Sequence, residues 1–577
     1  MEPTPSTEAS ARSISTVLLQ QSPVMMMVVF YSAAIVYATY WTESDPLKCV
    51  FFVFLLSLLL LTDAISAPVA ALFPIFMLPM LGLATTGEIS RAYSDVTQFS
   101  FLSIMFLVLA AVESGLYSRL ALLFLSTFGC SAQALLFSVI VPSVLVSLLF
   151  GSYLCTMLLW PIVDCVTDEL FLDNYPDDQR KVGEYVATGF PSPAPDINTS
   201  CLPAHAECQP YLHRVFESRS SREIHTERDQ LRNTLLLGLV YGTSIGCTGT
   251  PHGTLPNRRL FNFVNSFYGH HPLNYFTWFA YSIPALILCS LILWLYLFCF
   301  GVPSRFRVQN TVECRKLFKM RYTCLGKMKF HEVVVALMQI SVLLSNIVFR
   351  GSPTDFSEYR FGSRASFFVA IGSLVFIIPA IPVEGVDSPP LLSWSNFCSR
   401  MPWGCIFLCG AGMIVAKVAA TSGMYTALLE HLIKVQMPAM PVVMLMCLLT
   451  AILAELKNFR RREEIFWVPA LNLLALEKRA NPLLFMLPIS RLSCMTLVLP
   501  VANYPNAMLY EYASIPSWQL IKSGLLMKLA FLAIEIFTLL TMGYIVFDLG
   551  SIPSWAVTFI NATINATPEA LPSGTPV

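Results

Sequence analysis

The residues of this chain best suited to chemistry lie in two segments where helix-breaking residues interrupt an apolar run. The first, YGTSIGCTGTPHGTLPNRRL at residues 241–260, contains four Gly, five Thr or Ser and two Pro. The second, MTLVLPVANYPNAMLYEY at residues 495–512, is broken at Pro500, Pro505 and Asn506. Gly and Pro do not continue a regular helix, and the carbonyls and helix ends that they free suit a dehydrated cation or a carboxylate. A kink that serves only close helix packing is the alternative.

Both segments end in the same dipeptide, Pro256 followed by Asn257 and Pro505 followed by Asn506, with one copy in each half of the chain. Interrupted apolar segments at corresponding positions of two halves are the best sequence indication of the binding site of a secondary transporter. The pattern therefore predicts a transport site to which both halves contribute.

A third stretch, AELKNFRRREEIF at residues 454–466, places strong charge directly after an apolar run. An unpaired arginine near the centre of a bilayer costs at least about 2.5–3.5 kcal/mol, so it needs water, an anion or a carboxylate. Three interpretations remain open. In the first, Arg460, Arg461 or Arg462 replaces a cation beside a substrate anion, which a guanidinium binds with two hydrogen bonds. In the second, the next two glutamates pair with the arginines and close the site, and in the third the stretch lies in water.

Composition indicates the class of protein that contains these stretches. Hydrophobic residues make up 55% of the 577 residues and charged residues 12%, too few charges to cover a soluble surface. Lys+Arg and Asp+Glu are both 36, so the net charge of +0 gives no reason to expect a nucleic-acid partner. We find no zinc-type Cys and His spacing and no nucleophile-base pair, so we expect no enzyme and no cofactor. The sequence predicts an all-α polytopic membrane protein.

Apolar windows of about 19 residues divide the chain into membrane regions and polar inserts. Several windows are too short for one crossing and others too long, which predicts two re-entrant hairpins and broken helices beside about eleven transmembrane helices. The expected segments are a cytoplasmic N-terminal tail (1–23), a first membrane region with a hairpin (24–170), a polar cytoplasmic loop (171–232), a broken helix and the next span (233–301), a basic cytoplasmic loop (302–330), a second membrane region with a hairpin and a broken helix (331–556) and an extracellular C-terminal tail (557–577).

The expected orientation follows from charge and from glycosylation signals. Residues 302–330 hold eight Lys or Arg against one acid, which is typical of a cytoplasmic loop. Asn561 and Asn565 each begin an Asn-Ala-Thr sequon, which predicts glycosylation and an extracellular C-terminus. With the N-terminus in the cytoplasm, the number of crossings is odd.

Several longer stretches resemble one transporter family. SIGCTGTPHGTLPN at residues 244–257 is similar to the SIGGTATLTGTGPN loop of the divalent anion:sodium symporters, the solute carrier 13 family of dicarboxylate, citrate and sulfate transporters. Four further stretches resemble motifs of that family: LLLTDAISAPVAALFPIFMLPMLG, PWGCIFLCGAGMIVAKVAATSGM, FMLPISRLSCMTLVLPVANYPNAMLY and VFDLGSIPSWA. The matches follow the family's order along nearly the whole membrane domain. The chain is identified from them as a divergent member.

The resemblance implies a homodimer in which each chain has two inverted repeats. Each repeat contributes a hairpin and a broken helix to a transport domain that moves against a scaffold domain. Sodium lies between each hairpin tip and its Pro-Asn loop, and the substrate carboxylates bind beside the tips. The residues implied to bind substrate are Ser152, Thr156, Thr254, Asn257, Arg460, Arg461, Asn503, Pro505 and Asn506. Those implied to bind sodium, where it is retained, are Gly151, Ser152, Gly246, Thr248, Thr250, Asn257 and Asn506.

Both hairpin tips depart from the family pattern, which leaves sodium coupling open. The family's Ser-Asn-Thr falls on Gly151, Ser152 and Tyr153 at the first tip and on Phe459, Arg460 and Arg461 at the second. We expect a secondary active transporter of di- or tricarboxylates of the succinate or citrate class, with an elevator-type movement, in the plasma membrane. A sulfate transporter is one alternative, and a transport-inactive membrane scaffold or regulatory subunit is another. The expected partners are a small organic or inorganic dianion, a second copy of the chain and the lipid bilayer.

Overall fold

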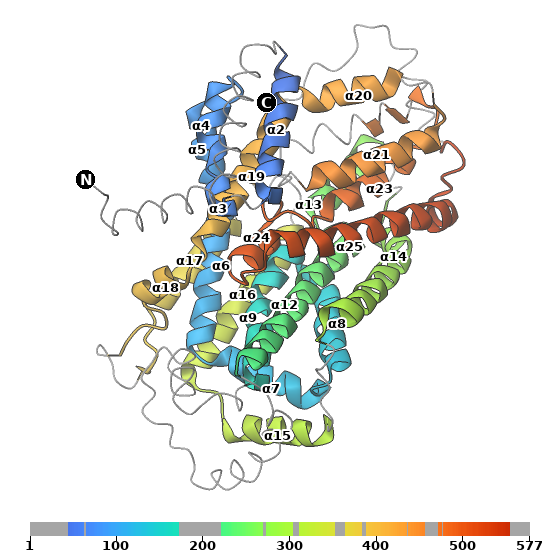
Figure 1. Ribbon diagram of the computed structural model, residues 1–577. Helices are drawn as coiled ribbons and strands as arrows, with labels where there is room; N and C mark the ends of the chain where they lie inside the picture. The colour runs from blue at the N-terminus through green and yellow to red at the C-terminus, as the bar shows by residue number, and fades with distance from the viewer. Residues whose placement is uncertain are drawn as a thin grey trace, which may run out of the picture.

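The protein is all-helical wherever its structure is described, apart from one isolated backbone pairing between Pro379 and Pro390. The computed structural model (Figure 1) describes residues 44–62, 65–171, 221–268, 273–303, 311–351, 364–382, 388–434, 437–455 and 471–553, except residues 473 and 476. This confirms the all-α class.

The first half of the described chain contains helices α2 (Asp45–Thr62), α3 (Ala67–Ala70), α4 (Phe73–Met80), α5 (Thr86–Tyr93), α6 (Val96–Glu113), α7 (Leu116–Phe128), α8 (Ala132–Phe150), α9 (Ser152–Phe171), α12 (Ser221–Gly246), η2 (Cys247–Gly249), α13 (Leu255–Phe267), α14 (Tyr275–Tyr296) and η3 (Leu297–Gly301). The second half contains α15 (Thr311–Cys324), α16 (Phe330–Gly351), α17 (Arg364–Ser373), η4 (Leu374–Phe376), α18 (Trp394–Arg400), α19 (Trp403–Thr421), α20 (Met424–Lys434), α21 (Ala439–Ala454), α23 (Pro482–Cys494), α24 (Tyr504–Glu511), α25 (Ser517–Thr538), η6 (Leu539–Gly543) and α26 (Tyr544–Phe547).

Six stretches of helix in the described part of the chain are long and apolar enough to cross a membrane. They are Asp45–Thr62, Thr86–Glu113, Ala132–Phe150, Tyr275–Gly301, Trp403–Thr421 and Ser517–Phe547. Several apolar helices of 10–17 residues accompany them, as expected for a membrane protein with broken and re-entrant elements. The polytopic class is therefore confirmed, and the total of about eleven crossings stays a prediction.

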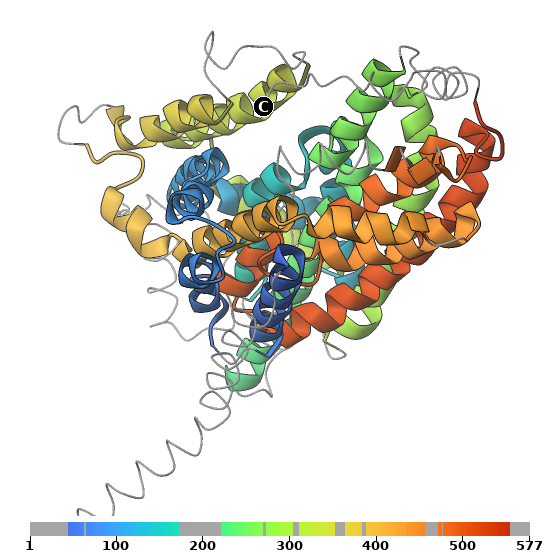
Figure 2. The same ribbon diagram turned by 90° about the horizontal axis from the view of Figure 1, so that it is seen from above.

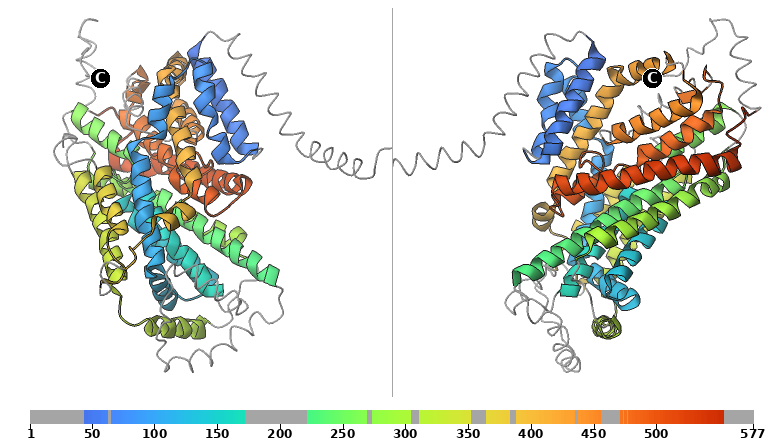
Figure 3. Two further views of the ribbon diagram at one scale, coloured as in Figure 1. Left: turned by 90° about the vertical axis from the view of Figure 1, so that its left-hand side faces the viewer. Right: turned by 45° about the vertical axis from the view of Figure 1, so that its right-hand side comes forward.

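The short helix α24 contacts two groups of helices. On one side, α19 packs against α2, α3 and α5, and Figure 2 shows α2, in dark blue, beside α19 and α20. On the other side, α12 packs against α8, α9 and α14, and α14 packs against α25. The right view of Figure 3 shows α12, α14 and α25 running side by side. Because α24 contacts α9, α12 and α19, the second Pro-Asn motif lies at the centre of the molecule.

Glycine determines how closely α8 and α12 approach each other. A Cβ atom on Gly242 would lie 2.2 Å from Ser143 Oγ, and one on Gly246 would lie 2.1 Å from Ser147 Oγ and 2.2 Å from the carbonyl oxygen of Val144. Only residues without a side chain permit such backbone contact, as in other closely packed membrane helices. The packing role, proposed above as the alternative for the Gly-rich segment, therefore applies to these two glycines.

Two segments expected to be loops are partly helical. α12 begins at Ser221, inside the predicted loop 171–232, and α15 lies within the predicted basic loop 302–330. Figure 1 shows α15 at the bottom of the molecule, where it packs against α7. The sequence did not predict these helices, because a polar helix at the end of a membrane domain has no apolar run by which sequence could identify it.

Ion pairs connect these polar helices to α9. The pairs are Arg228 with Asp168, Arg232 Nε with Asp164 Oδ1 at 2.7 Å, and Arg321 Nη1 with Glu169 Oε2 at 3.5 Å. All three carboxylates come from the end of α9, so this hairpin arm is held from both polar helices. Arg228, Arg232 and Arg321 are thus paired across elements.

Candidate functional site

One asparagine stabilises the loop that interrupts the first broken helix. α12 ends at Gly246, a short 3-10 turn follows, and α13 begins after Thr254, whose hydroxyl accepts a hydrogen bond from the backbone N–H of Asn257. The side-chain Nδ2 of Asn257 donates to the carbonyl oxygens of Thr248 (3.4 Å) and Thr250 (3.3 Å). Asn257 therefore pairs backbone groups that the helix break leaves without helical partners.

The second broken helix repeats this arrangement. α23 ends at Cys494, and α24 begins after Asn503, whose Oδ1 accepts from the backbone N–H of Asn506 at 2.8 Å. The Nδ2 of Asn506 donates to the carbonyl oxygens of Thr496 (3.1 Å) and Leu499 (3.2 Å). Pro256 and Pro505 occupy the same early position of the helices that follow the breaks, where a missing N–H costs nothing. Both predicted interruptions are confirmed, and their local geometry matches.

The two broken helices also contact each other. Asn257 Oδ1 accepts a hydrogen bond from Ser490 Oγ of α23 at 3.0 Å, and Thr254 Oγ1 lies 2.9 Å from Cys494 Sγ. From the other side, the hydroxyl of Tyr241 in α12 donates to the carbonyl oxygen of Leu497 at 3.3 Å. Residues far apart in sequence thus form one polar region buried among apolar helices.

The first predicted hairpin is present, and its tip contacts the first broken helix. α8 ends at Phe150, the φ of 81° at the next residue, Gly151, allows the chain to reverse, and α9 starts at Ser152. Just before the turn, the carbonyl oxygen of Leu148 accepts from Thr250 Oγ1 at 2.9 Å. Just after it, Thr156 Oγ1 lies 2.8 Å from Thr243 Oγ1 of α12. The first hairpin tip therefore lies against α12 and the loop that follows it.

An aromatic stack fills the space between this tip and α24. The rings of Tyr153 and Tyr504 lie 5.3 Å apart, and those of Tyr504 and Phe101 lie 4.6 Å apart and nearly parallel. Tyr153 stands at the first tip, where the sequence departs from the family pattern. These aromatic rings therefore connect the first hairpin tip to the second Pro-Asn loop.

The predicted second hairpin tip lies outside the part of the chain that the structure describes. Phe459, Arg460, Arg461 and Arg462 lie outside the described residues, as do the sequons at Asn561 and Asn565. The arm that leads to the tip, α21, is described, and it ends beside the second broken helix.

Two charged residues that the sequence analysis did not assign to a site lie at the second loop. Glu455, directly after α21, accepts hydrogen bonds from three consecutive backbone N–H groups, those of Leu497 (3.0 Å), Val498 (2.9 Å) and Leu499 (3.1 Å). Its carboxylate also pairs with the ammonium of Lys528 in α25. The available signal was Lys528 itself, because a lysine inside an apolar span is a functional candidate by default.

A second buried ion pair lies behind the second broken helix. Arg491 Nη1 of α23 is 3.0 Å from Glu535 Oε2 of α25, and both side chains are fully buried. Glu535 Oε1 also accepts from the hydroxyl of Tyr281 in α14 at 2.8 Å. These contacts join three helices, and the partners of both charges lie within the protein.

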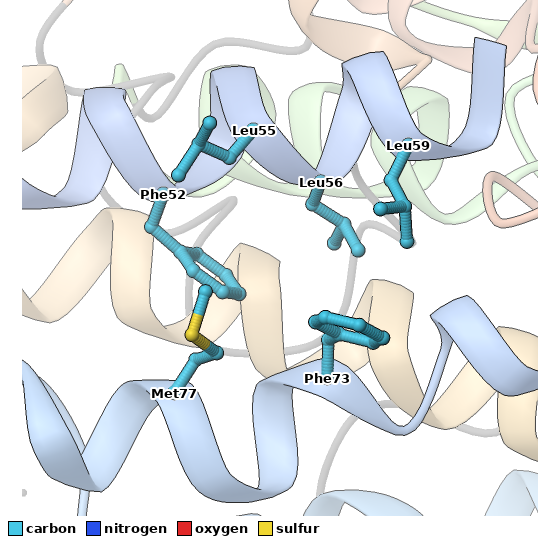
Figure 4. Close-up of a pocket in the computed structure, with 6 residues that line it drawn as sticks. All are labelled: Phe52, Leu55, Leu56, Leu59, Phe73 and Met77. Carbon is cyan, nitrogen blue, oxygen red and sulfur yellow. The ribbon is translucent and has the colours of Figure 1, made fainter. Parts of the chain in front are cut away.

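An apolar crevice lies away from this polar region, between α2 and α4 (Figure 4). It is lined by Phe52, Leu55, Leu56, Leu59, Phe73 and Met77. None of these six side chains can donate a hydrogen bond, so the crevice is not suited to a dianion. The polar region between the broken helices is the better candidate site.

Known proteins resemble this chain in sequence along nearly its whole length. The family model of the sodium:sulfate symporter transmembrane region matches residues 20–549. The chain is 26% identical over 572 residues to Na(+)/dicarboxylate cotransporter 3 of Rattus norvegicus, covering 92% of this chain and 93% of the relative. It is 26% identical over 566 residues to solute carrier family 13 member 2 of Oryctolagus cuniculus, covering 91% and 94%. It is 24% identical over 561 residues to solute carrier family 13 member 1 of Mus musculus, covering 90% and 94%.

These matches confirm the family that the sequence motifs indicated, and identity near 25% agrees with a divergent member. The matched family consists of transporters, which confirms that the chain is not an enzyme. The match extends over both broken helices and the first hairpin, and so includes the whole candidate site as described. The chain belongs to the sodium:sulfate symporter family.

Proposed function

We propose that the protein is a secondary active transporter of di- or tricarboxylate anions of the succinate or citrate class. The observation that carries this proposal is the doubled Pro-Asn geometry, in which Asn257 and Asn506 each close a broken helix in the interior of the membrane domain. Broken helices of this kind bind substrates and coupling ions in secondary transporters. Relatives named as sodium/dicarboxylate cotransporters support the carboxylate class, and the family description supports sulfate as the alternative substrate.

The proposed cation ligands are in the first half. The carbonyl oxygens of Thr248 and Thr250 both lie at the Asn257 amide, and the tip at Gly151 and Ser152 lies against the same loop through Leu148. Sodium prefers such oxygen ligands at a helix break. When bound, it would supply the positive charge that a carboxylate needs at low dielectric.

The substrate is proposed to bind between the first tip and the two loops. Its proposed contacts are Ser152, Thr156, Thr254, Asn257, Arg460, Arg461, Asn503, Pro505 and Asn506. A guanidinium from Arg460 or Arg461 would add two parallel hydrogen bonds to one carboxylate. We propose an elevator-type movement of this region, a homodimer and a plasma-membrane location as the family context of the same function.

Uptake of labelled anions tests the proposal. Vesicles that contain the purified full-length protein are given labelled succinate, citrate or sulfate, with sodium or with choline outside. We expect succinate or citrate to accumulate above protein-free vesicles, and a sodium gradient to increase the accumulation. Accumulation of sulfate alone would support the alternative substrate, and no accumulation of any of the three would contradict transport.

A transport-inactive scaffold is the second candidate, and the aromatic stack favours it. Tyr153 and Tyr504 occupy the space where the tip faces the second loop. Changing Tyr153→Thr removes one ring of the stack at an expected cost in stability of about 0.5–1.5 kcal/mol. An inactive wild type with an active Tyr153→Thr variant would show that the ring closes the site. Equal uptake by both would show that it does not.

A further inference from the structure

A lysine ammonium lies at the C-terminal end of the half-helix α23. Lys528 Nζ donates a hydrogen bond to the carbonyl oxygen of Met495 at 2.7 Å, and Met495 is the residue that caps α23. The same ammonium pairs with the Glu455 carboxylate, and the two side chains are only 5% and 8% exposed. The negative end of a broken helix is where coupling cations bind in secondary transporters.

The surrounding helices hold the ammonium there. Gly524 lies one turn before Lys528 on α25, and a Cβ atom at Gly524 would be 2.2 Å from the carbonyl oxygen of Leu497. The absence of a side chain lets α25 approach the loop closely enough for the lysine to reach it. On the opposite side, Glu455 is fixed by the N–H groups of residues 497–499. The carboxylate and the ammonium thus contact the loop from two different helices.

The first broken helix differs in the donors that reach its carbonyl groups. The carbonyl oxygen of Thr248 accepts from the Asn257 amide at 3.4 Å and from the Trp278 indole at 3.4 Å. The carbonyl oxygen of Ile245 accepts from the hydroxyl of Thr248 at 2.8 Å. All these donors are neutral, so the negative end of α12 receives no positive charge through them. The two halves therefore share a geometry but differ in charge.

We propose that the Lys528 ammonium is a tethered cation that occupies the second cation site, so that the second half binds no sodium. Glu455 balances its charge, and any coupling sodium binds at the first broken helix. The cation site rests on geometry alone, whereas its consequence for coupling rests on the proposed transport function. A transporter built this way couples fewer sodium ions to each anion than one whose two loops both bind sodium.

Sodium binding to the purified full-length protein tests the assignment without any need for transport. Thermal unfolding is followed in sodium chloride and in choline chloride for the wild type and for Lys528→Met. The shorter neutral side chain leaves Glu455 and the Met495 carbonyl free to bind sodium. We expect sodium to raise the Tm of Lys528→Met by at least about 2 °C more than it raises that of the wild type.

Two control variants identify the source of the effect. Lys522→Met changes an exposed lysine of the same helix, so its Tm should respond to sodium as the wild type does. Glu455→Gln combined with Lys528→Met removes the carboxylate as well, so the extra sodium response should disappear. Where uptake is measurable, the number of sodium ions coupled to each anion should rise by about one in Lys528→Met.

The proposal would be overturned if sodium raised the Tm of Lys528→Met no more than it raises that of the wild type. It would also be overturned if Lys528→Met were unfolded in both salts. The same holds if the double variant keeps the extra response. Asn506 Oδ1, a buried acceptor in the same loop without a hydrogen-bond partner among the described residues, could bind sodium beside an intact Lys528. In that event the wild type would already respond to sodium in this half, and Lys528→Met would gain nothing.

Discussion

At the scale of single residues, two asparagines donate the hydrogen bonds that backbone N–H groups would donate in a regular helix. Each side-chain amide donates to two loop carbonyl groups, and each backbone N–H is capped by the residue three positions earlier. A buried carbonyl left without a donor costs about 1–3 kcal/mol, so each amide has a large effect on the shape of its loop. The polar atoms that could face an ion keep their positions only while these bonds persist.

Replacing these asparagines should impair transport more than it impairs folding. For Asn257→Ala and Asn506→Ala we expect uptake of labelled succinate, per molecule at the surface, to fall roughly 5- to 150-fold, which corresponds to about 1–3 kcal/mol. Asn265→Ala is the matched control, because Asn265 donates to the carbonyl oxygen of Leu273 outside both loops. Equal losses for Asn265→Ala and Asn257→Ala would contradict a specific role of the loops.

At the scale of elements, the hairpin α8–α9 depends on its contact with α12. Gly242 and Gly246 allow the backbone of α12 to touch α8, and Thr156 with Thr243 and Thr250 with the Leu148 carbonyl join the hairpin to α12 and its loop. A tip placed by backbone contact cannot shift without moving the first broken helix. This is the kind of rigid support that an ion site needs.

A single methyl group should disturb this contact. Gly246→Ala places a Cβ within 2.2 Å of the backbone oxygen of Val144, which has no room to move away. We expect a loss of about 1–3 kcal/mol or more in stability, seen as a lower Tm and a lower yield of folded protein in detergent. Gly87→Ala is the matched control, because no atom lies within 4 Å of a Cβ there, and it should stay within about 1 kcal/mol of the wild type. Wild-type stability of Gly246→Ala would refute the close contact.

At the scale of the whole molecule, buried ion pairs connect helices that are distant in sequence. Arg491 and Glu535 are 44 residues apart, and with Tyr281 they join α23, α25 and α14. Removing one partner of a buried pair costs about 3–5 kcal/mol, because the other charge stays behind without compensation. The pair therefore fixes where the second broken helix lies relative to the rest of the membrane domain.

Loss of this pair should be far more damaging than loss of an exposed one. Arg491→Met should lower stability by about 3–5 kcal/mol, measured by thermal unfolding of the purified protein, and adding Glu535→Gln should recover part of the loss. Lys417→Met breaks the pair with Glu88, in which both side chains are 37% exposed, and should cost no more than about 1 kcal/mol. Similar costs for Arg491→Met and Lys417→Met would mean that the buried pair does not anchor α23.

The sequence by itself determined the class, the family and the two breaks, because each depends on local chemistry. Apolar runs, Gly and Pro inside them, and a capping Thr254 or Asn503 before Pro-Asn act within a few residues. Local patterns did not reveal that residues 221–232 and 311–324 are helical, because three of their arginines pair with carboxylates on another element that no local pattern connects to them.

Only the tertiary structure decided which charges meet. Lys528 and Glu455 are 73 residues apart, and no spacing rule links them, yet folding brings both to the end of α23. A charged residue inside an apolar helix needs a partner, but only the packing of α21, α23 and α25 determines which residue that partner is. The two similar helix caps could therefore be predicted from the sequence. The difference in charge between the two loops could not, because it depends on contacts that only the folded chain makes.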